Sequence, residues 1–103
     1  MKEADLMRLI QIETSKIGCK LFRNNVGVLQ DKRTGAYIRF GLCVGSSDLI
    51  GFYNGRFVAI EVKKKGGKPT QEQMDFVAAV ISDGGIGGIV YSVDEALDII
   101  KYS

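Results

Sequence analysis

Apolar residues near the start of the chain recur at the 3.6-residue spacing of a helix. Residues 3–17 carry this pattern, and Gly18 directly after them is typical of a helix end. The apolar side consists of Leu6, Leu9, Ile10 and Ile17, with Met7 at its edge. The pattern predicts an amphipathic first helix that packs against another layer.

Four stretches with the alternation of β-strands follow this helix. Residues 19–24 predict the first strand, and residues 37–41 predict a short second one. The segment between them, residues 25–35, is rich in Gly, Asn and charge, which predicts a loop. The other two strands flank Asn54-Gly55, the strongest short-range signal for a two-residue hairpin turn.

The turn at Asn54-Gly55 predicts the register of the hairpin. Counting back from a two-residue turn pairs Tyr53 with Arg56, Phe52 with Phe57, Ile50 with Ala59 and Asp48 with Glu61. The last pair places two carboxylates opposite each other, with Cβ atoms about 4.5–5.5 Å apart, an arrangement that destabilises a sheet unless a cation lies between them. Lys63 points to the same face because strand side chains alternate. A bulge or a longer loop would shift this register and move Asp48 away from Glu61.

Both faces of the hairpin carry apolar side chains, which predicts a sheet that is covered on both sides or nearly so. The face of the two carboxylates also carries Ile50, Phe52, Phe57 and Ala59, and the other face carries Leu49, Val58, Ile60 and Val62. Carboxylates in such surroundings are partly buried. Without a cation their burial would be costly.

The rest of the chain predicts two more helices and one more strand. Thr70-Gln-Glu-Gln73 is a capping box that opens a helix, which Gly84-Gly85 ends; its apolar residues are Met74, Val77, Ala78 and Ile81. Residues 86–91 predict a strand with so little side-chain bulk that another element packs close to its backbone. Ser92-Val-Asp-Glu95 is a second capping box. The predicted order α-β-β-β-β-α-β-α indicates an α/β fold with a central mixed sheet flanked by helices.

Composition indicates one soluble domain over residues 1–103. The length suits a single core, and 46% hydrophobic and 25% charged residues are ordinary values. No run approaches the roughly 18–20 apolar residues of a membrane helix, and the N-terminus lacks the apolar segment of a signal peptide. We therefore expect an intracellular, cytoplasmic protein without a membrane partner.

The cysteines and the absence of histidine narrow the chemistry. Cys19 and Cys43 have neither zinc-site spacing nor the pattern of a disulfide framework, so we expect both to be small buried hydrophobes. The chain has no histidine, which excludes Ser-His and Cys-His nucleophiles, histidine-ligated zinc and any histidine base. Catalysis would have to use carboxylates, lysines and a hard metal ion.

The net charge of +2 is a weak indication of a nucleic-acid partner, but the basic residues cluster. Lys63, Lys64, Lys65 and Lys68 lie within six residues, and Arg23, Lys32, Arg33 and Arg39 occupy another stretch. A lysine cluster by itself is most often a solvated loop. A long polyanion is the partner it would suit.

Asp48, Glu61 and Lys63 suit metal-assisted hydrolysis of a phosphodiester. The carboxylates are hard oxygen ligands of the kind that Mg²⁺ or Mn²⁺ prefers. Such a metal lowers the pKa of a bound water and neutralises charge on the phosphate, and a lysine can orient the water or stabilise that charge. Carboxylates alone could instead hold calcium structurally, although a lysine beside them would compete with that cation.

At these residues the sequence resembles the PD-(D/E)xK nuclease superfamily. Gly45-Ser-Ser-Asp48 is followed, thirteen positions after Asp48, by Glu61-Val-Lys63; Ser47 stands where the signature has proline, a common departure. Nearly the whole chain resembles the VRR-Nuc domains, in the stand-alone form carried by phages. The further motifs in matching order are Glu3, Phe22-Arg-Asn-Asn-Val-Gly27 and Thr70-x-x-Gln73.

The resemblance implies a restriction-endonuclease-like core and a Mg²⁺- or Mn²⁺-dependent DNA endonuclease that is selective for branched DNA. Stand-alone members behave like Holliday-junction resolvases and work as homodimers. By that pattern Asp48, Glu61 and the Val62 carbonyl bind the metal, Glu3 supports the metal site, Lys63 is catalytic and Gln73 reaches the site from the second helix.

Several residues have simpler explanations. Glu3 could be an acidic residue that favours the helix dipole, and Glu13 is its rival because both border the apolar side of the helix. Gln73 could only cap its own helix. Arg23, Asn24 and Asn25 could be polar residues at a strand end. Arg23, whose planar fork can bind two phosphate oxygens, is the better phosphate candidate. The residues that we expect to bind DNA are Arg23, Asn25, Lys64, Lys65 and Lys68.

The function predicted from the sequence is a metal-dependent endonuclease for branched DNA, with four-way junctions as the expected substrate. Two symmetric cuts need two sites, so we expect a homodimer with C2 symmetry. The alternatives are a non-catalytic nucleic-acid-binding module on the same fold and a DNA nickase without junction preference. An enzyme for a small phosphorylated substrate is disfavoured, because no Gly-rich phosphate loop opens a helix.

Overall fold

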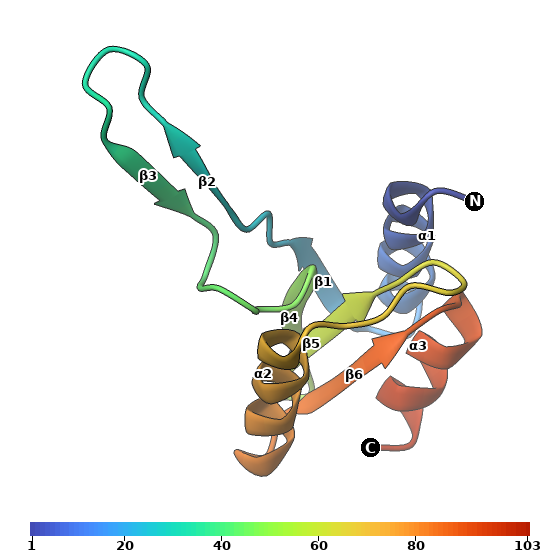
Figure 1. The fold of residues 1–103 in the computed structure, drawn as a ribbon. Helices are drawn as coiled ribbons and strands as arrows, with labels where there is room; N and C mark the ends of the chain where they lie inside the picture. The colour runs from blue at the N-terminus through green and yellow to red at the C-terminus, as the bar shows by residue number, and fades with distance from the viewer.

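The computed structural model describes residues 1–103 and has three helices and six strands. In chain order the elements are α1 (Glu3–Ser15), β1 (Lys20–Arg23), β2 (Gly27–Gln30), β3 (Tyr37–Phe40), β4 (Leu49–Tyr53), β5 (Arg56–Val62), α2 (Gln71–Ser82), β6 (Ile86–Val90) and α3 (Val93–Lys101) (Figure 1). The predicted α/β class is confirmed. The order also matches, with one strand more than expected between the first two helices.

The main sheet has the strand order β1-β4-β5-β6. β1 pairs with β4 and β4 with β5 in antiparallel fashion, whereas β5 and β6 are parallel. α2 is the crossover that a parallel pair requires. The central mixed sheet is therefore confirmed, and β5 lies at its centre with a partner on each side.

Helices cover both faces of this sheet. α1 and α3 pack together on one face, where Leu6, Ile10 and Ile100 meet the inward side chains of β5. α2 packs on the opposite face, over β5 and β6 (Figure 1). A Cβ added to Gly87 would lie 3.3 Å from Val77 of α2, and one added to Gly88 would lie 2.3 Å from Ile99 of α3. The close packing predicted along this strand is thus present on both of its faces.

The predicted register of the hairpin is confirmed. Tyr53 pairs with Arg56, Phe52 with Phe57 and Ile50 with Ala59. Asn54 and Gly55 both have positive φ, 50° and 77°, as a two-residue hairpin turn of type I′ requires. β4 begins at Leu49, so Asp48 stands one residue before the strand.

The prediction of a loop over residues 25–35 is wrong in part, because the segment contains β2. This strand pairs with β3 in an antiparallel sheet of its own, and the two form an arm that projects from the body of the protein (Figure 1). The amides of Asp31 and Gly35 close the turn between them, donating to the carbonyls of Ala36 and Asp31. The strand is short and its neighbours are rich in Gly, Asn and charge, so its alternation did not stand out.

The second face of the sheet is less covered than predicted. α2 covers Ala59, which is fully buried, but Phe52 and Phe57 near the turn stay 55% and 42% exposed. Of the apolar residues expected on the buried side of α2, only Val77 is buried. The helix crosses the sheet toward β6 and leaves the end near Asn54-Gly55 open.

Three smaller expectations also need correction. In α1, Met7 is buried and Leu9 is exposed, the reverse of the predicted centre and edge. Cys19 is buried, and burial raises the pKa of its thiol to about 11, but Cys43 is exposed because it lies in the loop between the arm and β4. Ser92 caps α3 by accepting from the Glu95 amide, while the Glu95 carboxylate accepts from the amide of Tyr91, so the capping box is half formed.

None of the three helices combines the length and the apolar character that crossing a bilayer requires.

Replacing either of two hairpin glycines by alanine should lower the stability of the protein by different amounts. A Cβ at Gly51 would lie 1.7 Å from the Lys20 carbonyl oxygen, whereas a Cβ at Gly55 meets nothing and only its positive φ opposes it. We expect Gly51→Ala to lower the free energy of unfolding by at least about 3 kcal/mol. Gly55→Ala should lower it by about 1–2 kcal/mol. Urea denaturation followed by circular dichroism measures both, and equal costs would contradict the pairing of β1 with β4.

Candidate active site

The candidate site lies where the hairpin strands end away from their turn. Asp48 precedes β4, and Glu61 is the last residue but one of β5, on the face toward α2. Asp48 Oδ2 accepts a hydrogen bond of 3.0 Å from the Val62 backbone N–H. The Asp48 side chain thereby occupies the place that a backbone partner would take one step further along the hairpin. This bond holds one carboxylate against the strand that carries the other.

Glu61 is an unusual residue for a sheet interior. Glu61 is only 1% exposed, and neither of its carboxylate oxygens has a hydrogen-bond partner. The pKa of Glu61 is raised to about 9, chiefly by burial and then by the neighbouring Asp48 carboxyl. The positive charge of Lys63 opposes this rise and the negative charge of Glu3 adds to it. Both charges are therefore close enough to act on the buried carboxyl.

Buried polar atoms almost always have partners, so those without one need an explanation. Here three lie near the strand ends: both Glu61 carboxylate oxygens and the Ser47 hydroxyl. A divalent cation held by Asp48 and Glu61 would satisfy the carboxylate and remove its repulsion from the neighbouring one. The residues present thus fit a hard cation.

The protein ligands for such a cation would be few. No three His, Cys, Asp or Glu side chains converge closely enough to hold a metal ion by themselves. The ligand set expected from the sequence consists of Asp48, Glu61 and the Val62 carbonyl. Mg²⁺ is commonly held by one or two carboxylates and keeps several waters, so this set is of a size that Mg²⁺ accepts.

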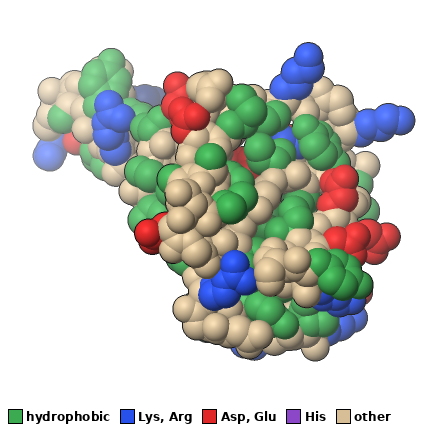
Figure 2. All heavy atoms as spheres, turned by 90° about the horizontal axis from the view of Figure 1, so that it is seen from below, with side chains coloured by type: hydrophobic (Ala, Val, Ile, Leu, Met, Phe, Trp, Pro, Cys, Tyr) green, Lys and Arg blue, Asp and Glu red, His purple; other side chains and the backbone are tan.

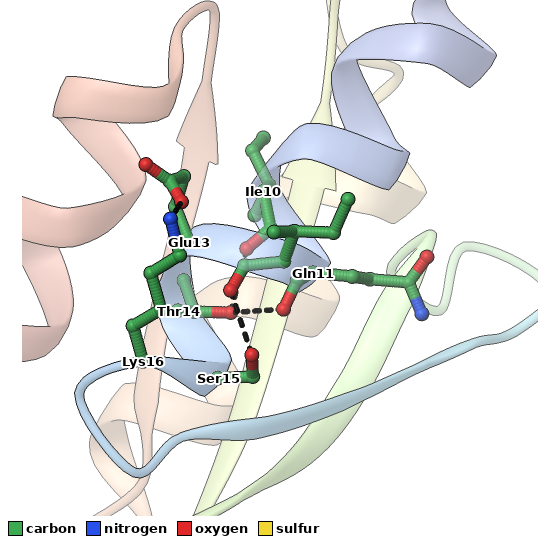
Figure 3. A network of polar contacts seen from close by, with 7 residues as sticks. Ile10, Gln11, Glu13, Thr14, Ser15 and Lys16 are labelled. Carbon is green, nitrogen blue, oxygen red and sulfur yellow. Dashed lines mark hydrogen bonds and ion pairs between the residues drawn. The ribbon is translucent and has the colours of Figure 1, made fainter.

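Only one of the two rival glutamates in α1 lies near the site. Glu3 Oε2 accepts a hydrogen bond of 3.3 Å from the backbone N–H of Lys64, directly after β5. Glu13 lies ten residues further along the helix, a rise of about 15 Å, and forms an ion pair of 2.5 Å with Lys16 (Figure 3). The geometry therefore places Glu3, and not Glu13, beside the end of β5.

Lys63 follows β5 directly, and its backbone N–H donates to the Val90 carbonyl at 2.9 Å. The side chain is half-buried and forms no ion pair with Asp48 or Glu61. The other lysines of the loop, Lys64, Lys65 and Lys68, are exposed. Their exposure agrees with a solvated loop and equally with a surface for a polyanion.

Gln73 caps its own helix and also lines a cavity at the strand ends. Its side chain accepts from the Thr70 N–H at 2.9 Å while the Thr70 hydroxyl accepts from the Gln73 N–H, so the capping box is confirmed. The same residue lines a cavity of about 310 Å³ at the strand ends. The other lining residues are Asn24, Asn25, Val26, Gly45, Ser46 and Asp48.

The structure thus brings Asp48, Asn25 and Gln73 to one cavity. Arg23 is exposed at the end of β1, and its guanidinium donates to the Asn25 side chain at 3.4 Å. Glu3 and Lys64 line a separate cavity of about 500 Å³ at the N-terminus of α1. Glu61 lies beneath the surface and lines neither cavity. The expected DNA-contacting residues therefore fall into two groups, one at the end of β1 and one in the loop after β5.

Asn24 organises the loop that carries Asp48, a role that the sequence did not reveal. Its amide nitrogen donates to the Ser46 hydroxyl at 2.8 Å and to the Ser47 carbonyl at 2.9 Å, and its oxygen accepts from the Leu42 N–H at 3.0 Å. Its backbone N–H also donates to the Asp48 carbonyl at 2.8 Å. The bonded partners lie 18–24 residues further along the chain, so only a folded structure identifies them.

Gly45 joins the same loop to α2. It has a φ of 84°, and a Cβ there would lie 2.7 Å from the Cβ of Glu72 and 2.8 Å from its carbonyl oxygen. Glycine is therefore required both by the backbone conformation and by the close approach. This contact sets the distance between the loop of Asp48 and the first turn of α2, which carries Gln73.

No protein-family model matches the sequence, and a search of curated proteins finds no match either. Membership of the VRR-Nuc domains and the roles assigned through that resemblance stay predictions.

Glu61 predicts a pH-dependent stability in metal-free protein. Its carboxyl keeps a proton up to about pH 9 in the folded state and loses it near 4.5 when unfolded. The unfolded state therefore binds fewer protons between these values, and the free energy of unfolding should fall by up to about 1.4 kcal/mol per pH unit as pH rises. Urea unfolding from pH 5 to 9 in EDTA measures this slope, which Glu61→Gln should remove.

Glu13→Gln is the matched control, because Glu13 is distant from the strand ends; that variant should keep the slope. Excess Mn²⁺ should also flatten it, since an ion bound at Asp48 and Glu61 stabilises the folded state with both carboxyls ionised. An unchanged slope in Glu61→Gln would refute the assignment of the proton to Glu61.

Proposed function

We propose that this protein is a Mg²⁺- or Mn²⁺-dependent endonuclease that hydrolyses phosphodiester bonds in branched DNA, with four-way junctions as the expected substrate. One observation carries the proposal. Glu61 is buried without a hydrogen-bond partner beside Asp48, whose own carboxylate is fixed by the Val62 N–H. An arrangement that destabilises the sheet so strongly is expected where a cation takes part in function.

When bound, the divalent cation would supply a more acidic coordinated water and neutralise charge on the phosphate. Asp48, Glu61 and the Val62 carbonyl would hold it. Lys63 would provide a positive charge at the strand end that orients the attacking water or stabilises the negative charge developing on the phosphate. Glu3, bonded to the Lys64 N–H, would support the site from α1.

The surface around the strand ends supports DNA as the substrate. Lys64, Lys65 and Lys68 are exposed on the loop that continues from β5, and Arg23 is exposed at the end of β1. Cations on both sides of the carboxylates could track the phosphates of a long polyanion. A junction offers two strands to cut in symmetric positions, so a C2 homodimer with one site in each chain is the corresponding assembly.

The exposed lysines would serve a second candidate function equally well, namely a non-catalytic nucleic-acid-binding module on the same fold. Such a module would bind DNA without cutting it. A third, a nickase without junction preference, would cut linear and branched DNA at similar rates. Cleavage and its dependence on substrate shape separate the three.

The first test of the proposed function is cleavage of matched linear, flapped and four-way DNA in Mg²⁺, Mn²⁺ or EDTA. We expect cuts only with metal and fastest on the four-way junction. Asp48→Asn and Lys63→Ala should each lower the single-turnover rate about 10²–10³-fold, because each removes a charge that acts on the transition state. Both variants should retain DNA binding in a gel-shift assay.

Binding without cleavage in either metal would refute the endonuclease and leave the non-catalytic module. Equal rates on linear DNA and junctions would refute the structural selectivity and leave the nickase.

A second test compares the two glutamates of α1. Glu3→Gln should lower the cleavage rate about 10–100-fold, as is usual for a residue that supports metal ligands from outside the coordination sphere. Glu13→Gln loses a comparable charge from the same helix and should stay within about twofold of the wild type. Equal effects of the two substitutions would contradict the role of Glu3, and thermal denaturation of both variants checks that each is folded.

A further inference from the structure

The arm formed by β2 and β3 is poorly supported by its own chain. Its two strands pair only with each other in a sheet separate from the main one. Every residue of β3 is exposed, as is every residue of β2 except Gly27. A two-stranded hairpin is marginally stable by itself in water. The arm therefore needs a second surface to hold its position.

The register of the arm separates its side chains into an apolar face and a polar one. The apolar face consists of Leu29, Ile38 and Phe40. The ring of Phe40 lies across Gly27, where a Cβ would come within 2.4 Å of it. The opposite face carries Val28, Gln30, Tyr37 and Arg39, and the turn between the strands carries Lys32 and Arg33. Figure 2 shows hydrophobic and basic side chains together on the projecting arm.

The main sheet offers a matching surface at the end that α2 leaves open. Phe22 and Phe52 contact there with ring centroids 6.2 Å apart, and Phe57 lies beside Phe52 as its strand partner. A cavity of about 710 Å³ runs from Phe57 to Phe76 and Val80 of α2. A second, of about 520 Å³, shares Phe57 with it and extends over Phe22 and Phe52. We call this continuous surface the aromatic groove.

We propose that the arm of one chain lies with its apolar face in the aromatic groove of a second copy, and that the second copy returns the same contact. The arm projects away from the sheet of its own chain, so it does not fill its own groove (Figure 1). Two copies related by a twofold axis satisfy both surfaces at once and leave no further arm or groove open. The proposal names the interface of the homodimer expected for the endonuclease, and it rests on the proposed function only for the need of two sites.

The exposed apolar area agrees with a stable dimer. Seven large side chains of the arm and groove are 41–63% exposed, namely Phe22, Leu29, Ile38, Phe40, Leu42, Phe52 and Phe57. With about 150–250 Å² for a whole aromatic side chain, and less for an aliphatic one, they offer on the order of 600 Å² per chain. Apolar atoms make up about 60% of an interface, so the total is about 1,000 Å² per chain. A standard interface uses about 800 Å² per partner.

Charge favours a second protein chain over DNA in the groove. The apolar face of the arm has no charged residue. Two cations line the groove: Arg56 donates to the carbonyls of Gly84 and Gly85, and Arg23, beside Phe22, donates to the Asn25 side chain. The exposed carboxylate of Asp83 lines the same groove and would repel a phosphate backbone there. Lys32 and Arg33 at the tip and Arg39 on the polar face remain outside the contact.

The interface is tested by the molar mass in solution, measured by light scattering across a dilution series without DNA or metal. Wild-type protein should be a dimer. Ile38→Lys in the arm and Phe52→Lys in the groove should each raise the dissociation constant about 100-fold or more, because each places a charge in both symmetric contacts. Gln30→Lys, on the polar face of the arm, is the matched control and should stay within about threefold of the wild type.

Mixing the two variants gives a sharper test. A heterodimer of Ile38→Lys with Phe52→Lys contains one unaltered arm in one unaltered groove, so the mixture should dimerise more tightly than either variant alone. Circular dichroism of each variant checks that it is folded. If Phe52→Lys leaves the dissociation constant of the dimer unchanged, the arm does not bind in the groove. That result would indicate arm-to-arm pairing instead.

A monomeric wild type would also overturn the proposal, as would variants that weaken DNA binding without changing the molar mass. These outcomes are distinguishable from failure of the proposed function. A dimer that cuts no DNA refutes the endonuclease alone, and metal-dependent cleavage by a monomer refutes the interface alone.

Discussion

The turn at Asn54-Gly55 sets the register on which the positions of the candidate catalytic groups depend. Because side chains alternate along a strand, a shift by one residue would move Glu61 from the α2 face to the core and its neighbours in the opposite direction. No such shift is present: the turn has the φ values of a two-residue hairpin, and the strands pair from Tyr53–Arg56 to Leu49–Ile60. Asp48 then meets the Val62 amide at the far end, where its carboxylate continues the hydrogen bonding of the hairpin. The turn and the candidate site thus lie at opposite ends of the same pair of strands.

The loop before β4 is held by a second set of constraints that acts at a distance along the chain. Asn24, at the end of β1, bonds to Leu42, Ser46 and Ser47. Gly45 presses the same loop against the first turn of α2. Strand, loop and helix therefore meet around Asp48, and the base of the arm belongs to the same network.

The buried carboxyl of Glu61 lowers the stability of the sheet. A small domain has few buried groups to spare, and here one of the largest fully buried side chains is an acid without a hydrogen-bond partner. An apolar residue at that position would pack against Ile89 and α2 at lower cost. The proposed cation would offset this cost by pairing with the ionised carboxyl, whose pKa the charge of Lys63 lowers and that of Glu3 raises.

The sequence by itself determined most of the secondary structure, the hairpin register and the face that Asp48 and Glu61 share. These features depend on local rules: helical and strand periodicity, a turn dipeptide and a capping box at Thr70. It did not show that β2 pairs with β3, that α2 leaves Phe52 and Phe57 open, or that Glu3 rather than Glu13 approaches β5. Each of those depends on contacts between segments distant in the chain, where the direction of a helix across a sheet decides what is buried. Tertiary structure also decided the role of Asn24, because a polar side chain that bonds 18–23 residues away leaves no periodic signal.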